Sequence, residues 1–250
     1  MTVISKHSET VMPADHAALH PGAAGWRQVM AQLAVLLHET GVHASRVIVL
    51  MPYAQLIQQA KNAWMAHLVD TGQAASFMPR FESTMNWATS LASAHGGFVP
   101  SADDLTLDAA IDVLTAANLL ERAGLATQKT ALSGRLLEAA WSLAGVASAQ
   151  VPDQRLTWGT GLASDLGASM EAPVLALELA VARIALIWAA TSVYPTDILF
   201  TAQADRLVVL EGFQSDPLAH ALRQHFGDRA STLKLDHRAQ RRLHGRAGKR

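Results

Sequence analysis

A carboxylate at the end of an apolar run is the first candidate for chemistry in this chain. Glu211 closes the run 206–211, and a carboxylate at the end of a buried strand is the hard oxygen ligand that magnesium prefers. Gln214 lies three residues further on. Asp216 is better placed to cap the next helix, so Glu211 lacks a second carboxylate with which to share an ion. We therefore predict a degenerate acidic motif of Glu211 and Gln214, with no metal, no cofactor and no catalytic residue.

The sequence lacks a phosphate-binding loop. The pattern G-x-x-x-x-G-K-[ST], whose backbone amides and lysine hold phosphates, does not occur. The stretch 22–25 is too short for dinucleotide binding, and a G-x-S-x-G nucleophile elbow is missing as well. We expect no ATP hydrolysis. Weak nucleotide binding through residues 13–25 and Glu211 remains an alternative.

Polar and aromatic side chains after two predicted strands could contact single-stranded DNA. An arginine neutralises phosphate, hydroxyls donate hydrogen bonds to it, and aromatic rings stack on bases. The candidates are Tyr53, Gln55, Arg80, Ser83, Thr84 and Trp87. Trp87 suits the core of the following helix equally well, and Tyr53 and Gln55 also fit the start of a helix.

Short β-branched runs alternate with helical periodicity, which predicts an α/β fold. The runs 47–51 and 207–210 are apolar throughout, as in strands that are covered on both faces, so we expect them to be the central strands of a small, mainly parallel sheet. Further extended pieces are expected at 9–12, 76–81 and 198–200.

Helical spacing of apolar residues predicts helices around this sheet and a large helical insert. We expect helices at 26–39, 53–71, 85–94, 101–124, 129–149, 172–193 and 216–226, and 156–169 is ambiguous. The resulting plan is a poorly ordered segment 1–25, an α/β domain 26–230 with a helical insert at about 101–193, and a basic, disordered tail 231–250.

The composition excludes several classes of function. The 250 residues carry a net charge of -1 with 16% charged residues, so any affinity for nucleic acid must be local. Without cysteine the chain has no disulfide, thiol nucleophile or iron–sulfur site. The apolar stretch 172–193 contains Glu178 and Arg183, which favours a buried helix over a membrane span. We expect a cytoplasmic protein with no membrane association.

Three stretches in order resemble a known family. VIVLMPYAQL (47–56), FMPRFESTMNWATSL (77–91) and LVVLEGFQSDP (207–217) are similar to successive motifs of superfamily 1 helicases. Together they most resemble the inactivated helicase part of the AddB-type subunit of bacterial helicase–nuclease complexes, which process double-strand breaks for recombination. The resemblance spans about residues 9–230, and no single motif in it is specific.

The resemblance implies a scaffold without motor activity. No lysine stands where the family's active members hold phosphate, Glu211 replaces the usual aspartate, and Gly212 replaces the catalytic glutamate. It implies a role in DNA repair and recombination through single-stranded DNA or a helicase–nuclease partner subunit. The family's C-terminal helicase and nuclease parts would lie beyond Arg250. A truncated product without an independent function is the remaining alternative.

Overall fold

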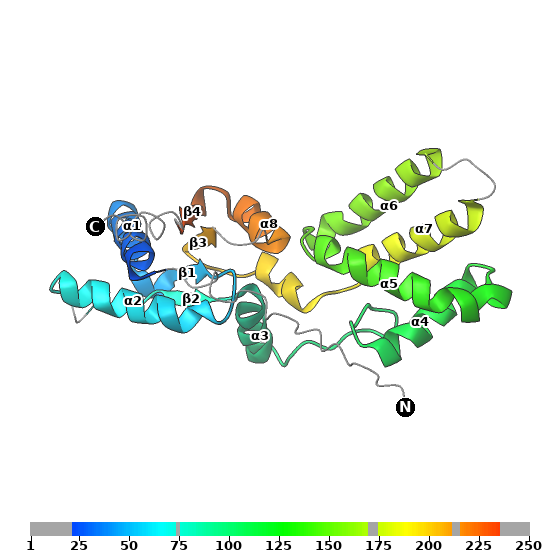
Figure 1. Cartoon of the computed structure of the whole chain (residues 1–250), viewed down its shortest axis with the longest axis horizontal. Helices are drawn as coiled ribbons and strands as arrows, with labels where there is room; N and C mark the ends of the chain where they lie inside the picture. The colour runs from blue at the N-terminus through cyan, green and yellow to red at the C-terminus, as the bar shows by residue number, and fades with distance from the viewer. Residues whose placement is uncertain (1–21, 74–75, 170–174, 212–215, 236–250) are drawn as a thin grey trace, which may run out of the picture.

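The computed structural model describes residues 22–73, 76–169, 175–211 and 216–235. The chain forms two lobes that lie side by side along the long axis of the molecule (Figure 1). One lobe is a sheet covered by helices, and the other consists of helices. The predicted strand at 9–12 lies outside the described residues.

A four-stranded, all-parallel sheet forms the centre of the first lobe. Its strands are β1 (Val47–Leu50), β2 (Arg80–Glu82), β3 (Arg206–Glu211) and β4 (Ala230–Lys234), in the order β2-β1-β3-β4. The register pairs Val47 with Arg206 and Ile48 with Arg80. The prediction of an α/β fold with a small parallel sheet and two apolar central strands is therefore confirmed.

Helices cover both faces of the sheet. Alternate residues of β1 point to opposite faces, so Val47 and Val49 join one hydrophobic cluster and Ile48 and Leu50 join another. The first cluster includes α1 (Ala23–Thr40) and α2 (Leu56–Asp70). The second includes α3 (Thr84–Ala94), α8 (Pro217–Phe226) and the 3-10 helix η5 (Pro195–Phe200).

The chain changes direction across the sheet between β1 and β3. The step from β1 to β2 runs through α2 on one face, and the step from β3 to β4 runs through α8 on the other. Right-handed crossovers in opposite directions require helices on opposite faces. The carboxyl ends of β1 and β3 therefore flank the switch point where doubly wound sheets bind ligands.

Four helices with their own core form the second lobe. They are α4 (Ala109–Arg122), α5 (Lys129–Ala147), α6 (Pro152–Ser169) and α7 (Ala176–Thr191), and α4, α5 and α7 share a buried cluster that includes Leu120, Leu136 and Trp188. In the described part of the chain, no helix has the length and hydrophobicity needed to cross a bilayer. Short 3-10 turns complete the fold: η2 (Ala44–Arg46), η3 (Ala126–Gln128) and η6 (Gly227–Arg229).

Several predicted boundaries are wrong. The helix expected from residue 101 begins at Ala109, because Asp108 caps it by accepting hydrogen bonds from the amides of Ala110 and Ile111. Asp104 instead is buried and accepts hydrogen bonds from the amides of Ser101 and Val193.

The segment 198–200, expected as a strand, lies within η5. The carboxylate of Asp197 accepts a hydrogen bond from the amide of Tyr194 and stabilises the turn. Leu199 and Phe200 are buried in the hydrophobic cluster on the α3 and α8 face of the sheet. A buried helical turn of this length and a buried strand both require a short apolar run, so the sequence could not distinguish them.

The two predicted terminal segments are partly structured. Residues 231–234 of the predicted tail belong to β4, and Leu233 and Leu235 are buried in the core. At the other end, α1 starts at Ala23 rather than Trp26. Residues 1–21 and 236–250 lie outside the description.

Candidate nucleic-acid interface

The predicted acidic motif lies at the carboxyl end of β3. Glu211 is exposed, and in the sheet register it is paired with Lys234 of β4. Gln214 lies outside the described residues. Within the described ranges, no three His, Cys, Asp or Glu side chains gather in a way that could hold a metal ion. One exposed carboxylate beside a lysine can bind cations only weakly.

Tyr53 and Gln55 follow β1 at the same edge. The carbonyl of Tyr53 accepts a hydrogen bond from the amide of Leu56 at 3.1 Å, and its ring packs against the core on the α1 and α2 face. Gln55 is exposed at the N-cap position of α2, where its side chain makes no capping hydrogen bond. Of these two residues, Gln55 offers the more accessible polar group to a ligand.

Ser83 and Thr84 begin α3 after the edge strand β2. The hydroxyl of Ser83 accepts a hydrogen bond from the amide of Asn86 at 3.2 Å and thereby caps the helix. Both side chains are half-buried at the positive end of the helix dipole. The Ser83 hydroxyl can still donate its hydrogen to a phosphate oxygen.

Trp87 lies in the hydrophobic core rather than on the surface. Its side chain is 1% exposed, and its ring lies 6.3 Å from the ring of Phe226. Stacking on a base is excluded in this conformation. The periodicity of α3 decides the outcome, because Trp87 and Ala88 form the stripe that faces the sheet.

Arg80 starts β2, so it lies at the amino edge of the sheet rather than with the other candidates. Its guanidinium nitrogen Nη2 lies 3.3 Å from the Glu82 carboxylate, and 43% of its side chain is exposed. The predicted residues are thus divided. At the carboxyl edge, Glu211 ends a strand and four candidates follow strands: Tyr53, Gln55, Ser83 and Thr84. Arg80 instead begins a strand at the amino edge.

Arg80 shares a polar depression with residues that the sequence analysis did not select. We call it the amino-edge hollow; its volume is about 280 Å³, and it is lined by Ser45, Arg46, Ile48, Arg80, Gln203, Ala204 and Asp205. Arg46 is 67% exposed, and its Nε lies 2.9 Å from the carboxylate of Asp205. One signal could have revealed this site: charged residues stand directly before both predicted central strands, at Arg46 and at Asp205 and Arg206.

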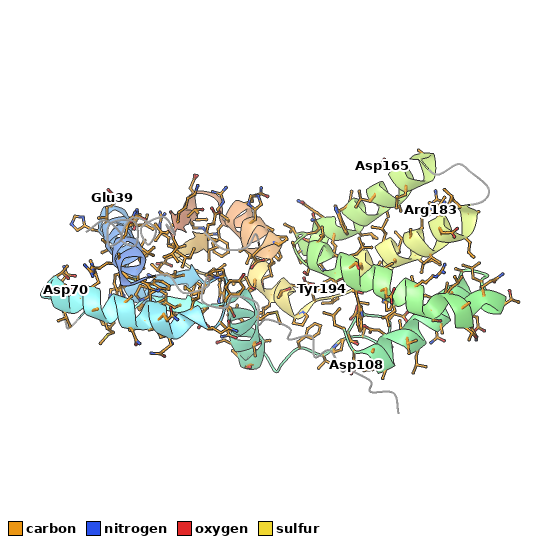
Figure 2. The ribbon with its side chains drawn as sticks, in the orientation of Figure 1. Glu39, Asp70, Asp108, Asp165, Arg183 and Tyr194 are labelled. Carbon is orange, nitrogen blue, oxygen red and sulfur yellow. The ribbon has the colours of Figure 1, made fainter. Side chains whose placement is uncertain are left out.

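A buried arginine lies elsewhere and has a structural role. Arg155 is 3% exposed, and it donates to the carbonyls of Ala147, Gln150 and Ser192 and to the carboxylate of Asp197. Its guanidinium also lies 4.9 Å from the centre of the Tyr194 ring. Tyr194 lies between the two lobes (Figure 2).

The Tyr194 hydroxyl is unsuited to acid–base catalysis at neutral pH. Burial raises its pKa above the ordinary range, and the hydroxyl donates to the carbonyl of Ala189 at 2.9 Å. The Arg155 and Asp197 charges are compensated by each other and by backbone carbonyls, as in a buried structural pair. This cluster joins the ends of α5 and α7 to the start of α6 and to η5.

Comparison with known proteins identifies no relative. No family model matches the chain, and neither a curated protein nor a solved structure matches it.

Proposed function

We propose that this protein is a non-catalytic, helicase-like scaffold that holds single-stranded DNA during the processing of DNA ends for recombination. In this role, motor and nuclease activities belong to a helicase–nuclease partner subunit. The proposal joins the resemblance of three sequence stretches to the distribution of charge around the sheet.

One observation carries the proposal: two exposed arginines, one directly before β1 and one at the start of the neighbouring β2, share the amino-edge hollow. Arg46 and Arg80 present guanidinium groups, which recognise phosphate through paired hydrogen bonds. Ser83 and Thr84 begin α3 three and four residues after Arg80, or about 10–13 Å along an extended chain. A polynucleotide can contact both places, whereas a single phosphate reaches one.

The absence of a catalytic set in the sequence supports the scaffold role over a motor. ATP hydrolysis by a P-loop motor needs a lysine and a glycine-rich cradle that the sequence lacks. Glu211 is exposed at a strand end and is aligned with Lys234. These features suit a protein that binds DNA without consuming nucleotide.

Fluorescence anisotropy with labelled oligothymidylate tests the proposal. The full chain and a chain ending at Leu235 should both bind, and the affinity of each should fall as salt rises. The truncation must not begin earlier, because Leu233 and Leu235 are part of the core. Loss of all binding on removal of residues 236–250 would assign the affinity to the basic tail and contradict the proposal.

A further inference from the structure

We propose that the amino-edge hollow is a phosphoryl-oxyanion site whose two arginines are held in position by Glu82 and Asp205 until the ligand arrives. The site shares Arg80 with the candidates selected from the sequence, but it lies at the opposite edge of the sheet from the others. The inference rests on the proposed function in one respect only, which is that single-stranded DNA is the polymer that carries the phosphate.

The sheet register brings the two arginines to one place. Arg46 directly precedes β1, and Arg80 is paired with Ile48, two residues after Arg46. The loop that precedes β3 supplies the opposite wall through Gln203, Ala204 and Asp205. Because the hollow is assembled from two strand starts and one loop, its shape depends on the folded sheet.

Each arginine has more N–H donors than its carboxylate partner within the protein uses. A guanidinium carries five N–H groups in a fixed fork. Arg46 engages Asp205 through Nε at 2.9 Å, and Arg80 engages Glu82 through Nη2 at 3.3 Å. Such exposed, single-nitrogen pairs contribute little to stability, so an oxyanion that accepts two hydrogen bonds can replace them.

The lining favours phosphate over a nucleobase or an apolar ligand. The polar side-chain groups are the hydroxyl of Ser45, the amide of Gln203, the two guanidiniums and the carboxylate of Asp205 that is paired with one of them, and none of the seven lining residues is aromatic. A base would find no ring on which to stack. A tetrahedral oxyanion has enough acceptor atoms to serve both guanidiniums at once.

The two internal carboxylates oppose the ligand, which gives the site a distinctive mutational signature. Glu82 and Asp205 repel an incoming anion and occupy one nitrogen of each arginine. Removing either carboxylate charge should strengthen oxyanion binding, and removing either arginine should weaken it. A purely structural role for these pairs predicts no such opposite effects on a ligand.

The test titrates inorganic pyrophosphate into the full-length, ¹⁵N-labelled protein at low salt. The Nε–Hε NMR signals of Arg46 and Arg80, assigned by their loss in Arg46→Gln and Arg80→Gln, should shift and saturate with a Kd on the order of 1 mM. Each substitution should raise the Kd measured at the remaining arginine by about tenfold. Asp205→Asn and Glu82→Gln should lower it severalfold. Arg135, an exposed arginine in the helical lobe, serves as the reference signal.

The inference is overturned if the Arg46 and Arg80 signals do not move, if Arg135 shifts equally, or if the two carboxylate substitutions weaken binding in a protein of unchanged thermal midpoint. Oligothymidylate anisotropy on the same variants separates the two proposals. Saturable pyrophosphate binding without DNA binding supports the site and contradicts the proposed function alone. DNA binding that is insensitive to Arg46→Gln and Arg80→Gln, with no pyrophosphate binding, removes the site and leaves the scaffold role.

Discussion

The side chains of Arg46 and Asp205 meet at 2.9 Å although they are far apart in the sequence. Each stands directly before a strand, and the first residues of those strands, Val47 and Arg206, are paired in register. The parallel sheet therefore aligns the residues that precede its strands. Charge placed there creates a surface that no local motif encodes.

Loss of the buried guanidinium should destabilise the junction between the lobes. Arg155→Ala leaves the Asp197 carboxylate without its ionic partner and removes the hydrogen bonds from Arg155 to three backbone carbonyls, so the free energy of unfolding should fall by about 3–5 kcal/mol. Urea unfolding monitored by circular dichroism measures this change. Arg135→Ala, at an exposed position, should cost less than about 0.5 kcal/mol. Equal effects of the two substitutions would contradict the role assigned to Arg155.

Two glycines of α6 should respond to alanine in opposite directions. A Cβ at Gly159 would lie 2.4 Å from the Cβ of Ala190, so Gly159→Ala must push α6 from α7 and should cost about 1–3 kcal/mol. A Cβ at Gly161 would have nothing within 4 Å, so Gly161→Ala should stabilise the helix by about 0.5–1 kcal/mol. Thermal unfolding of both variants checks the prediction, and stabilisation by both would show that α6 and α7 do not approach closely.

Stability should decline in alkali because of Tyr194. Burial raises its pKa in the folded state above the value of about 10 that applies when the chain is unfolded. The unfolded state therefore loses the proton first, and stability that is fully present below pH ~10 is lost as pH rises further. The predicted slope is up to about 1.4 kcal/mol per pH unit. Tyr194→Phe should flatten the stability curve above pH ~10 in urea titrations; an unchanged slope would count against this cause.

ATP turnover should stay at background in the wild-type protein and in Glu211→Gln. The exposed Glu211 has no phosphate-reaching lysine or glycine-rich loop to work with. A steady-state phosphate-release assay makes the comparison. Turnover that Glu211→Gln abolishes would restore Glu211 as a functional motor residue.

The central fold was predictable because its signals are local. The apolar runs of β1 and β3 lie between breaks in helical periodicity, and burial on both faces demands such runs. The edge strand β4 was missed because Leu233 is its only buried residue, and the rest of this short strand is mostly polar. The ambiguity of α6 has a similar cause, since glycines lower helix propensity while Gly159 permits close packing against α7.

The candidate site was predictable only in part. The sequence selected Arg80, Ser83 and Thr84 by residue type, but it could not distribute them between the two edges of the sheet. The sequence also allowed Trp87 to be either a surface residue that stacks on a base or a core residue. The face of α3 that packs against the sheet contains Trp87, which places it in the core. Arg46 and Asp205 become a pair only through the register of β1 and β3.

The central claim is that Arg80 contacts the phosphates of single-stranded DNA, and the salt dependence of oligothymidylate binding to the chain that ends at Leu235 tests it most directly. A phosphate contact made by Arg80 predicts that Arg80→Gln weakens binding and lowers the slope of log K against log salt by about one, and that Arg135→Gln changes neither quantity. Identical affinities and slopes for the wild-type, Arg80→Gln and Arg135→Gln proteins, or no binding at low salt, would contradict it.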